Sequence, residues 1–271
     1  ASDALNMIQN MKITNISGVP TQSWDLLNHP KVDDFDLSSL IDIGAGGAAR
    51  PEEQVQSLHD KFNLPLTFGW GMTETCALGA INRGDEYLAK PNSSGLNVPY
   101  LTQVAVTDEN WNFLNTGEVG EIVFKSPTNM IGYLKNEEET KKALKDGWLL
   151  TGDLGYIDDE GYLFIVDRKK SLIIRGGENI STLEVENALD RHANILESCV
   201  CGIDDPKFGE IVGAYIYCNA DVSKEAIKEF LNYSIASYKV PEILYISKDP
   251  LPRIATEKID RVGIKKILST Q

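Results

Sequence analysis

The chain has 271 residues, 42% of them hydrophobic, and a formal net charge of −14 at pH 7. A chain this acidic repels the phosphates of nucleic acids and the surface of anionic membranes, so neither is an expected partner. No apolar run approaches the roughly 20 residues that a membrane-spanning helix needs, so no integral membrane segment is expected.

Residues 1–94 alternate predicted strands and helices. An apolar strand at 40–43 precedes a helix that begins at Pro51, and a second apolar strand follows at 64–68. The order strand, helix, strand predicts a parallel α/β sheet. We therefore assign this region to the C-terminal part of a large α/β domain.

Residues 95–168 contain short predicted strands separated by Gly, Asn and Asp, among them a hairpin at 156–166. One helix interrupts these strands. Asn136 is placed to cap its first turn, and Gly147 is expected to end it. We expect a small β-barrel subdomain.

Residues 169–271 are expected to form a separate, mobile α+β C-terminal domain. Ser181 and Glu184 have the spacing of a capping box at the start of one helix, and Ser223 is placed to cap another. A length of about 100 residues suits an independent domain.

The four cysteines, Cys76, Cys199, Cys201 and Cys218, lack the second Cys or His pair that a metal site usually requires. We expect all four to be buried apolar side chains. Free thiols are typical of a reducing compartment, so a cytoplasmic location is expected.

The segment 40–49 also fits a different pattern. Gly44, Gly46 and Ala49 have the spacing of the Rossmann dinucleotide fingerprint, and the segment is similar to the first motif of S-adenosylmethionine-dependent methyltransferases. Both alternatives need an acidic residue about 20 positions further on, at the end of the next strand. Residues 68–71 end that strand without an acid, which disfavours both.

Residues 69–75 follow a predicted strand, where open α/β sheets bind their ligands. Glycines here allow the backbone to approach a ligand, while Trp70 supplies an aromatic plane and Thr73 a hydroxyl. Glu74 supplies a hard carboxylate suited to Mg²⁺. By itself, such a turn is as typical of a structural loop as of a binding site.

The run Gly-Trp-Gly-Met-Thr-Glu at 69–74 resembles the Gly-Tyr-Gly-Met-Thr-Glu signature of the adenylate-forming superfamily. That superfamily includes acyl-CoA synthetases, aryl-CoA ligases, firefly luciferases and the adenylation domains of peptide synthetases. Further matches follow in the family's order at 117–122, 130–133, 147–155, 167–180 and 238–261. By these collinear motifs the chain is identified as a member of the superfamily, most similar to the C-terminal half of a fatty-acyl-CoA ligase.

The resemblance implies a binding site for ATP and AMP. The residues that correspond to the family's adenine-binding segments are Gly46, Gly47, Ala48, Trp70, Gly71 and Met72. Trp70 would stack on the base in place of the usual tyrosine, which preserves the aromatic face. Asp153 resembles the carboxylate that accepts both ribose hydroxyls, and Arg168 the guanidinium that also reaches the ribose.

The resemblance further implies that Lys258 drives the first half-reaction. Negative charge builds on the phosphoryl oxygens when a carboxylate attacks the α-phosphate of ATP, and an ammonium there stabilises the transition state. Thr73 through its hydroxyl and Glu74 through Mg²⁺ would act on the same phosphate.

For the second half-reaction the family rotates its C-terminal lid, and Lys170 lies at the hinge position. Gly176 and Gly177 would line the path of the coenzyme A thiol, because glycines leave room for it. Such a lid lets one site perform two reactions while it excludes water from the acyl-adenylate.

Two departures from the family pattern stand out. No Ser/Thr/Gly-rich phosphate loop is present, so we expect a fragment that needs the missing N-terminal half of the same enzyme. Glu257 replaces the glycine that usually precedes the catalytic lysine, and its carboxylate is placed to pair with Lys258.

The expected activity is therefore that of an acid–CoA ligase that forms AMP and acts on a small carboxylic acid, ATP and CoA. A fatty or related acid is favoured because the run 73–95 resembles that of fatty-acid ligases. Two alternatives remain: a carrier-linked adenylation domain and a non-catalytic AMP-binding fragment.

Overall fold

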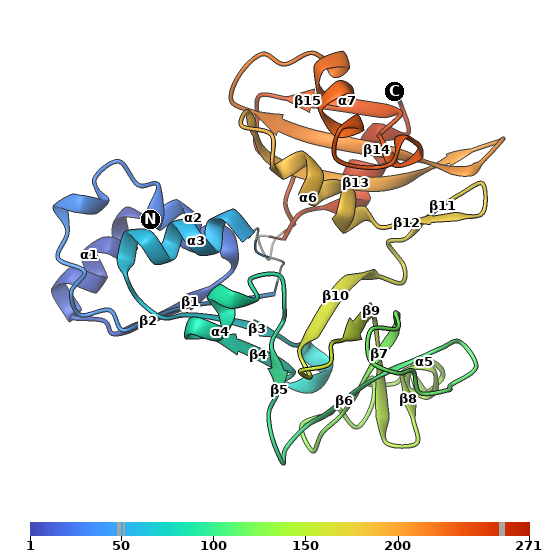
Figure 1. Cartoon of the computed structure of the whole chain (residues 1–271), viewed down its shortest axis with the longest axis horizontal. Helices are drawn as coiled ribbons and strands as arrows, with labels where there is room; N and C mark the ends of the chain where they lie inside the picture. The colour runs from blue at the N-terminus through green and yellow to red at the C-terminus, as the bar shows by residue number, and fades with distance from the viewer. Residues whose placement is uncertain (48–49, 51, 255–257) are drawn as a thin grey trace. The chain divides into compact units, whose positions relative to one another are not determined.

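The computed structural model describes residues 1–47, 50, 52–254 and 258–271. These residues form two compact units, Ala1–Ile165 and Val166–Gln271 (Figure 1). Each unit contains hydrophobic clusters of its own. The division into three regions at 94 and 168 stays a prediction.

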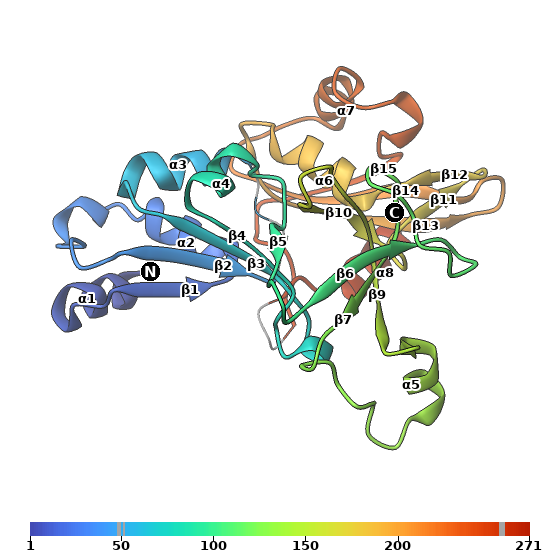
Figure 2. The same ribbon diagram turned by 60° about the horizontal axis from the view of Figure 1, so that its bottom comes forward.

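The first unit contains a five-stranded sheet in the order β1 (Asn15–Gly18), β2 (Asp42–Gly46), β3 (Leu66–Trp70), β4 (Ala80–Arg83) and β5 (Leu96–Asn97). β1, β2 and β3 are parallel, whereas β4 and β5 are antiparallel to their neighbours. Figure 2 shows β1 to β4 side by side. The predicted parallel α/β sheet is confirmed, with the strands about two residues later in the chain than expected.

Helices pack on this sheet through apolar faces. They are α1 (Ser2–Met11), α2 (Pro20–Leu27), α3 (Glu52–Phe62) and α4 (Gly84–Ala89). Val55 and Leu58 of α3 are buried against Ile43 of β2 and Leu66 of β3, three residues apart as a helical stripe requires.

The second sheet of the chain has the order β10 (Leu163–Arg168), β9 (Trp148–Ile157), β7 (Gly120–Lys125) and β6 (Gln103–Thr107), and β8 (Leu144–Lys145) pairs with β9. Among the described residues this strand order does not close on itself, so the structure shows an open sheet where a barrel was expected. Asn136 caps α5 (Glu137–Ala143) as predicted. The helix ends before Gly147, because Leu144 and Lys145 pair with β9 instead.

The second unit is an α+β arrangement with a sheet in the order β12 (Glu178–Ile180), β11 (Ile173–Arg175), β14 (Gly209–Cys218) and β13 (Ile195–Asp205), and β15 (Ile243–Ser247) pairs with β14. Its helices are α6 (Thr182–Asp190), α7 (Lys224–Asn232) and α8 (Arg261–Leu268). Ser181 and Ser223 cap α6 and α7 as predicted. Short 3₁₀ helices span Val32–Asp34, Thr73–Thr75 and Ser237–Lys239.

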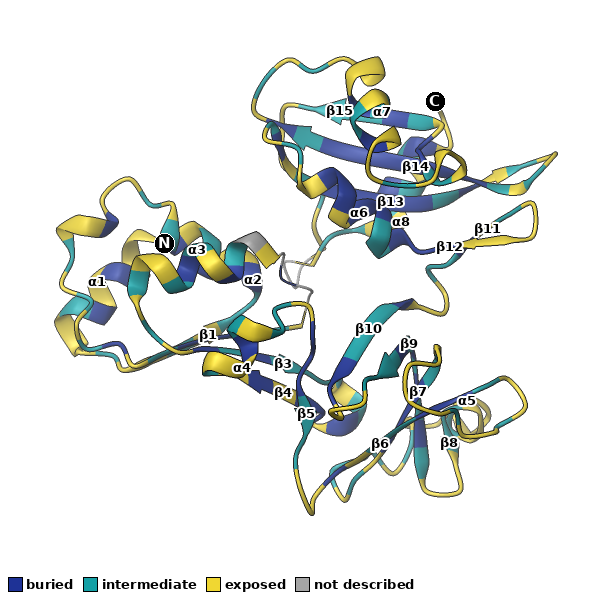
Figure 3. Cartoon of the chain, viewed as in Figure 1, coloured by how far each residue is buried: buried dark blue, intermediate teal, exposed yellow. Residues whose placement is uncertain are grey.

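The two faces of this sheet belong to different hydrophobic clusters. Val200 of β13 packs in the cluster with α6 and α7, whereas its neighbours Cys199 and Cys201 pack in the cluster with Ile264 and Leu268 of α8. Successive side chains of a strand point to opposite faces, so α8 covers one face and α6 and α7 the other. In Figure 3, β13 and β14 are buried along most of their length.

The structure corrects one cysteine assignment. Cys199, Cys201 and Cys218 are buried free thiols, as expected, but Cys76 is exposed. Cys76 follows the Thr73–Thr75 turn and has a φ of 54°. No helix in the described part of the chain is both long and apolar enough to cross a bilayer.

Candidate nucleotide site

The ends of β2 and β3 bring two predicted adenine-binding segments together. Gly46 pairs with Gly69 in the parallel ladder, so Gly46 and Trp70 end adjacent strands. A Cβ built on Gly46 would lie 2.8 Å from the carbonyl oxygen of Gly69, and Gly47 has a φ of 79°. Both positions therefore favour glycine. Ala48 lies outside the described residues.

Trp70 contacts Asp153 although 83 positions separate them. The indole Nε1–H donates a hydrogen bond to Asp153 Oδ2 at 2.9 Å, and Asp153 is only 5% exposed. The indole also packs edge-on against Phe124 of β7. Gly79 lies so close that a Cβ there would be 2.6 Å from Trp70 Cε3. No sequence motif pointed to this role of Gly79.

The backbone around Asp153 is held by β7. The Asp153 amide donates to Thr151 Oγ1 at 3.1 Å, and that hydroxyl donates to the Ile122 carbonyl at 2.7 Å. Gly152 has a φ of 71°, and its amide donates to Glu121 Oε1 at 3.2 Å. These contacts set the direction of the carboxylate. Thr151 belongs to the recognised motif, but its structural role became visible only through its partners.

The turn that follows Trp70 is stabilised by hydrogen bonds of a buried threonine side chain. Thr75 is fully buried, and its hydroxyl donates to the Met72 carbonyl and accepts from the Met72 amide. A Cβ on Gly71 would lie 2.5 Å from the Ala77 carbonyl oxygen. Thr73 is exposed.

Glu74 is tied to the segment Met130–Tyr133 at two points. The Tyr133 hydroxyl donates to Glu74 Oε1 at 2.8 Å, and the Met130 amide donates to the Glu74 carbonyl at 2.7 Å. Burial, followed by the hydrogen bond to Glu74, raises the pKa of Tyr133 to about 12. Sequence reasoning matched Tyr133 to a motif without assigning it a role.

Glu74 fits a magnesium site in which the substrate supplies further ligands. Mg²⁺ is commonly held by one or two carboxylates, with phosphate oxygens and waters completing the shell. The Tyr133 hydrogen bond orients this carboxylate while leaving its charge uncancelled. Among the described residues no cluster of three or more His, Cys, Asp or Glu is placed to hold a metal ion.

The second unit carries the other predicted site residues. Asp167 is buried and accepts hydrogen bonds from the Arg168 amide at 2.6 Å and the Thr182 amide at 2.5 Å. This carboxylate links the end of β10 to the start of α6. Arg168 and Lys170 are both exposed.

Gly176 and Gly177 form the turn between β11 and β12. Their φ values are 60° and 93°, a conformation that L side chains rarely adopt. The Gly176 amide donates to the Phe208 carbonyl at 2.7 Å, which fastens this turn to the start of β14.

Lys258 is exposed and lies just before α8. Its carbonyl accepts a hydrogen bond from the Ile254 amide at 2.9 Å, and Arg253 forms an antiparallel bridge with Ile259. Glu257 lies outside the described residues, so its expected pairing with Lys258 stays a prediction.

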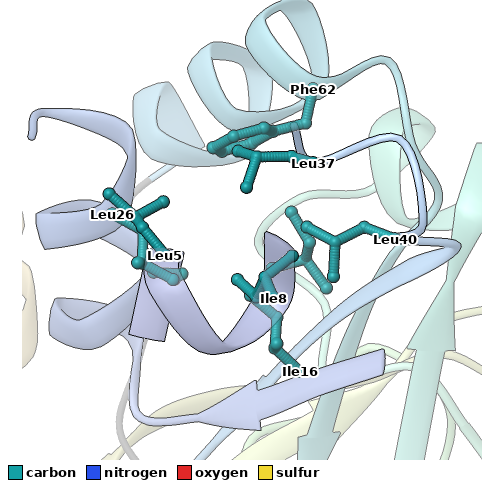
Figure 4. Close-up of a pocket in the computed structure, with 9 residues that line it drawn as sticks. Leu5, Ile8, Ile16, Leu26, Leu37, Leu40 and Phe62 are labelled. Carbon is teal, nitrogen blue, oxygen red and sulfur yellow. The ribbon is translucent and has the colours of Figure 1, made fainter. Parts of the chain in front are cut away.

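A separate apolar gap lies among α1, α2 and the strands of the first unit (Figure 4). It is lined by Leu5, Ile8, Ile16, Ser23, Leu26, Leu37, Leu40, Ile43 and Phe62. The space is too narrow for a water molecule, and no predicted site residue lines it. It is a packing gap within the core.

Residues 1–134 match the family described as AMP-binding enzyme, and residues 184–258 match the AMP-binding enzyme C-terminal domain. The chain is 38% identical over 261 residues to 2-succinylbenzoate–CoA ligase of Bacillus licheniformis, covering 96% of this chain and 53% of that protein. It is 38% identical over 263 residues to long-chain-fatty-acid–CoA ligase of Bacillus subtilis, covering 96% and 46%. The chain spans about half the length of the curated relatives it matches.

Solved structures show the same fold. The o-succinylbenzoate CoA synthetase of Bacillus subtilis, bound to the acyl-adenylate OSB-AMP, superposes with a TM-score of 0.87 at 32% identity over 97% of this chain and 53% of that one. The amide bond synthetase McbA of Marinactinospora thermotolerans gives 0.88 at 27% identity over 98% and 54%.

Fold and sequence thus place the chain in the family described as AMP-binding enzyme. The chain belongs to the adenylate-forming superfamily, and the relatives it matches include acid–CoA ligases.

Proposed function

We propose that the chain carries the AMP-binding and lid portions of an acid–CoA ligase that forms AMP. The reaction joins a carboxylic acid to CoA and converts ATP to AMP and pyrophosphate through an acyl-adenylate. The hydrogen bond between Trp70 and Asp153 supports this proposal most directly, because it joins two motifs that the family uses for one nucleotide. The CoA ligases among the relatives support CoA as the acceptor of the acyl group.

In the first half-reaction, the substrate carboxylate attacks the α-phosphorus of ATP and pyrophosphate leaves. Asp153 accepts the ribose hydroxyls, and Trp70 packs against the base. The Lys258 ammonium and the Thr73 hydroxyl stabilise charge that develops on the phosphoryl oxygens. Glu74 would hold Mg²⁺, which supplies charge neutralisation at the phosphates. A solved relative, the same o-succinylbenzoate synthetase, binds ATP and a magnesium ion.

In the second half-reaction, the CoA thiol attacks the acyl carbonyl and AMP leaves. Residues 169–271 act as the mobile lid, with Lys170 at the hinge and Arg168 directed to the ribose. The turn at Gly176 and Gly177 leaves room for the thiol. Residues 1–94 and 95–168 form the body of the site.

A fatty or related acid is the proposed acyl group, and the three buried free thiols support a cytoplasmic location. The similarity to a long-chain-fatty-acid–CoA ligase supports the fatty acid. Relatives that act on 2-succinylbenzoate and indoleacetate supply the competing substrates for a test.

The proposal predicts that AMP binds this chain through Asp153. AMP should raise the melting temperature of the chain and of Asp85→Asn, a control that removes an exposed charge from α4. Asp153→Asn should lose the shift, because a neutral amide accepts the ribose hydroxyls more weakly. Differential scanning fluorimetry measures all three.

The protein expressed from its complete reading frame should then release AMP only when acid, ATP and CoA are all present. The panel is a long-chain fatty acid, 2-succinylbenzoate and indoleacetate. AMP release that requires a carrier protein instead of CoA would favour the carrier-linked alternative. AMP binding without any acid-dependent turnover would favour the non-catalytic fragment, and an equal thermal shift in Asp153→Asn would contradict the assigned site.

A further inference from the structure

We propose that Glu186 and Glu197 are positioning residues that hold the Lys258 segment through Arg261 and Arg253. The proposal rests on the function proposed above, because that function gives Lys258 its task. All the contacts lie within the second unit. They explain how the backbone that carries the exposed Lys258 is held in place.

Two backbone hydrogen bonds join the described residues at 252–254 to those at 258–260. The Ile254 amide donates to the Lys258 carbonyl at 2.9 Å, and the Asp260 amide donates to the Pro252 carbonyl at 2.8 Å. Arg253 and Ile259 form an antiparallel bridge between these two hydrogen bonds. The segment therefore has two arms, an incoming arm at Arg253 and an outgoing arm at Arg261.

The outgoing arm is fastened to α6 and β13. Arg261 Nη2 donates to Glu186 Oε2 at 2.9 Å, and Nη1 donates to the Val200 carbonyl at 3.2 Å. The other Glu186 oxygen accepts from the Val200 amide at 2.8 Å. The Glu186 side chain is only 10% exposed while that of Arg261 is 43% exposed, so a buried carboxylate holds a guanidinium at the surface.

The incoming arm is fastened to the same strand. Glu197 of β13 forms an ion pair with Arg253, and its second oxygen accepts from the Leu251 amide at 3.2 Å. Leu251 is buried in the cluster that holds α8. Both arms thus attach to β13, one at Glu197 and one at Val200.

A lysine ammonium sits on a long flexible stem, so its reach depends on where its Cα is held. The hydrophobic clusters hold the sheet and α8, whereas these two ion pairs hold the arms next to Lys258. A displacement of about 1 Å at a catalytic group can reduce a rate about a hundredfold. The proposed function uses Lys258 only for adenylation, so loss of the two ion pairs should affect that step selectively.

The test compares Glu197→Gln and Arg253→Met/Arg261→Met with the parent protein in the complete reading frame. ATP–pyrophosphate exchange reports adenylation, and supplied acyl-adenylate with CoA reports thioester formation. We expect adenylation to fall about tenfold or more while thioester formation stays within about twofold. Lys239→Met is the matched control, because it removes a cation bound to Glu184 of the same helix α6 at 2.6 Å.

Amide hydrogen exchange in the 271-residue chain supplies a readout independent of turnover. Exchange at Ile254 and Asp260 should accelerate in the arm variants and stay unchanged in Lys239→Met. Equal losses in both half-reactions, or unchanged exchange at these amides, would overturn the proposal. If Lys258→Ala leaves adenylation intact, the catalytic assignment fails, and the exchange result still decides whether the carboxylates hold the segment.

Discussion

Two carboxylates of the candidate site accept hydrogen bonds from aromatic side chains. Trp70 donates to Asp153 through its indole, and Tyr133 donates to Glu74 through its hydroxyl. A neutral donor fixes the direction of a carboxylate without cancelling its charge. In the proposed function, that charge would act on the ribose hydroxyls at Asp153 and on a cation at Glu74.

This arrangement predicts the ionisation of Tyr133. Because burial and the bond to Glu74 raise its pKa from 10.0 to about 12, the fold favours the neutral phenol. That contribution to stability is fully present below pH 10 and is lost as the pH rises through about 12. The difference in phenolate absorbance between the parent chain and Tyr133→Phe should show a step near pH 12.

In Glu74→Gln the same step should move to lower pH, since the neighbouring negative charge is gone. A Tyr133 step near pH 10 in the parent chain would contradict the hydrogen bond to Glu74.

The sequence predicted Trp70, Asp153, Thr73 and Glu74 as site residues, because they lie in motifs with a recognised order. It did not predict Thr75, Tyr133 or Gly79 as their supports. Those roles depend on side chains that meet across the fold, and no local pattern encodes such a meeting.

At the scale of elements, capping and periodicity were reliable because both are local. Asn136, Ser181 and Ser223 each accept a hydrogen bond from an amide in the first turn of their helix. The end of α5 was predicted wrongly because pairing of Leu144 with β9, a tertiary contact, overrides the signal of Gly147. Barrel closure likewise depends on which distant strands pair.

The adjacent ends of β2 and β3 predict different tolerances for two paired glycines. Gly46→Ala should reduce the free energy of unfolding by about 1–3 kcal/mol, because its Cβ would meet the Gly69 backbone at 2.8 Å. Gly69→Ala should change it by less than about 1 kcal/mol, since its Cβ would meet only the Ala80 carbonyl at 4.0 Å. Urea unfolding of both variants measures these changes. Equal losses of unfolding free energy would show that β2 and β3 can move apart to accommodate the added methyl group.

At the scale of the whole molecule, the chain consists of two units with separate cores. The second unit, Val166–Gln271, has buried clusters on both faces of its sheet. The hydrogen bond from the Thr182 amide to Asp167 also lies within this unit. The unit therefore contains the packing that an independent domain requires.

Residues 166–271 expressed alone should consequently fold and unfold in one cooperative transition. Circular dichroism during urea titration measures this. Ile227→Asp, which places an unpaired charge in the cluster beneath α7, should abolish the transition. A fragment without cooperative unfolding would show that the unit depends on residues 1–165 for its stability.

The alternation of side chains along β13 has a chemical consequence. Cys199 and Cys201 lie under α8, whereas Cys218 packs with the opposite layer. Their sulfur atoms are shielded from a reagent in water while α8 stays docked. Alkylation of Cys199 and Cys201 would therefore report how often α8 separates from the sheet. Alkylation of Cys218 would serve as the internal reference for the layer beneath α6 and α7.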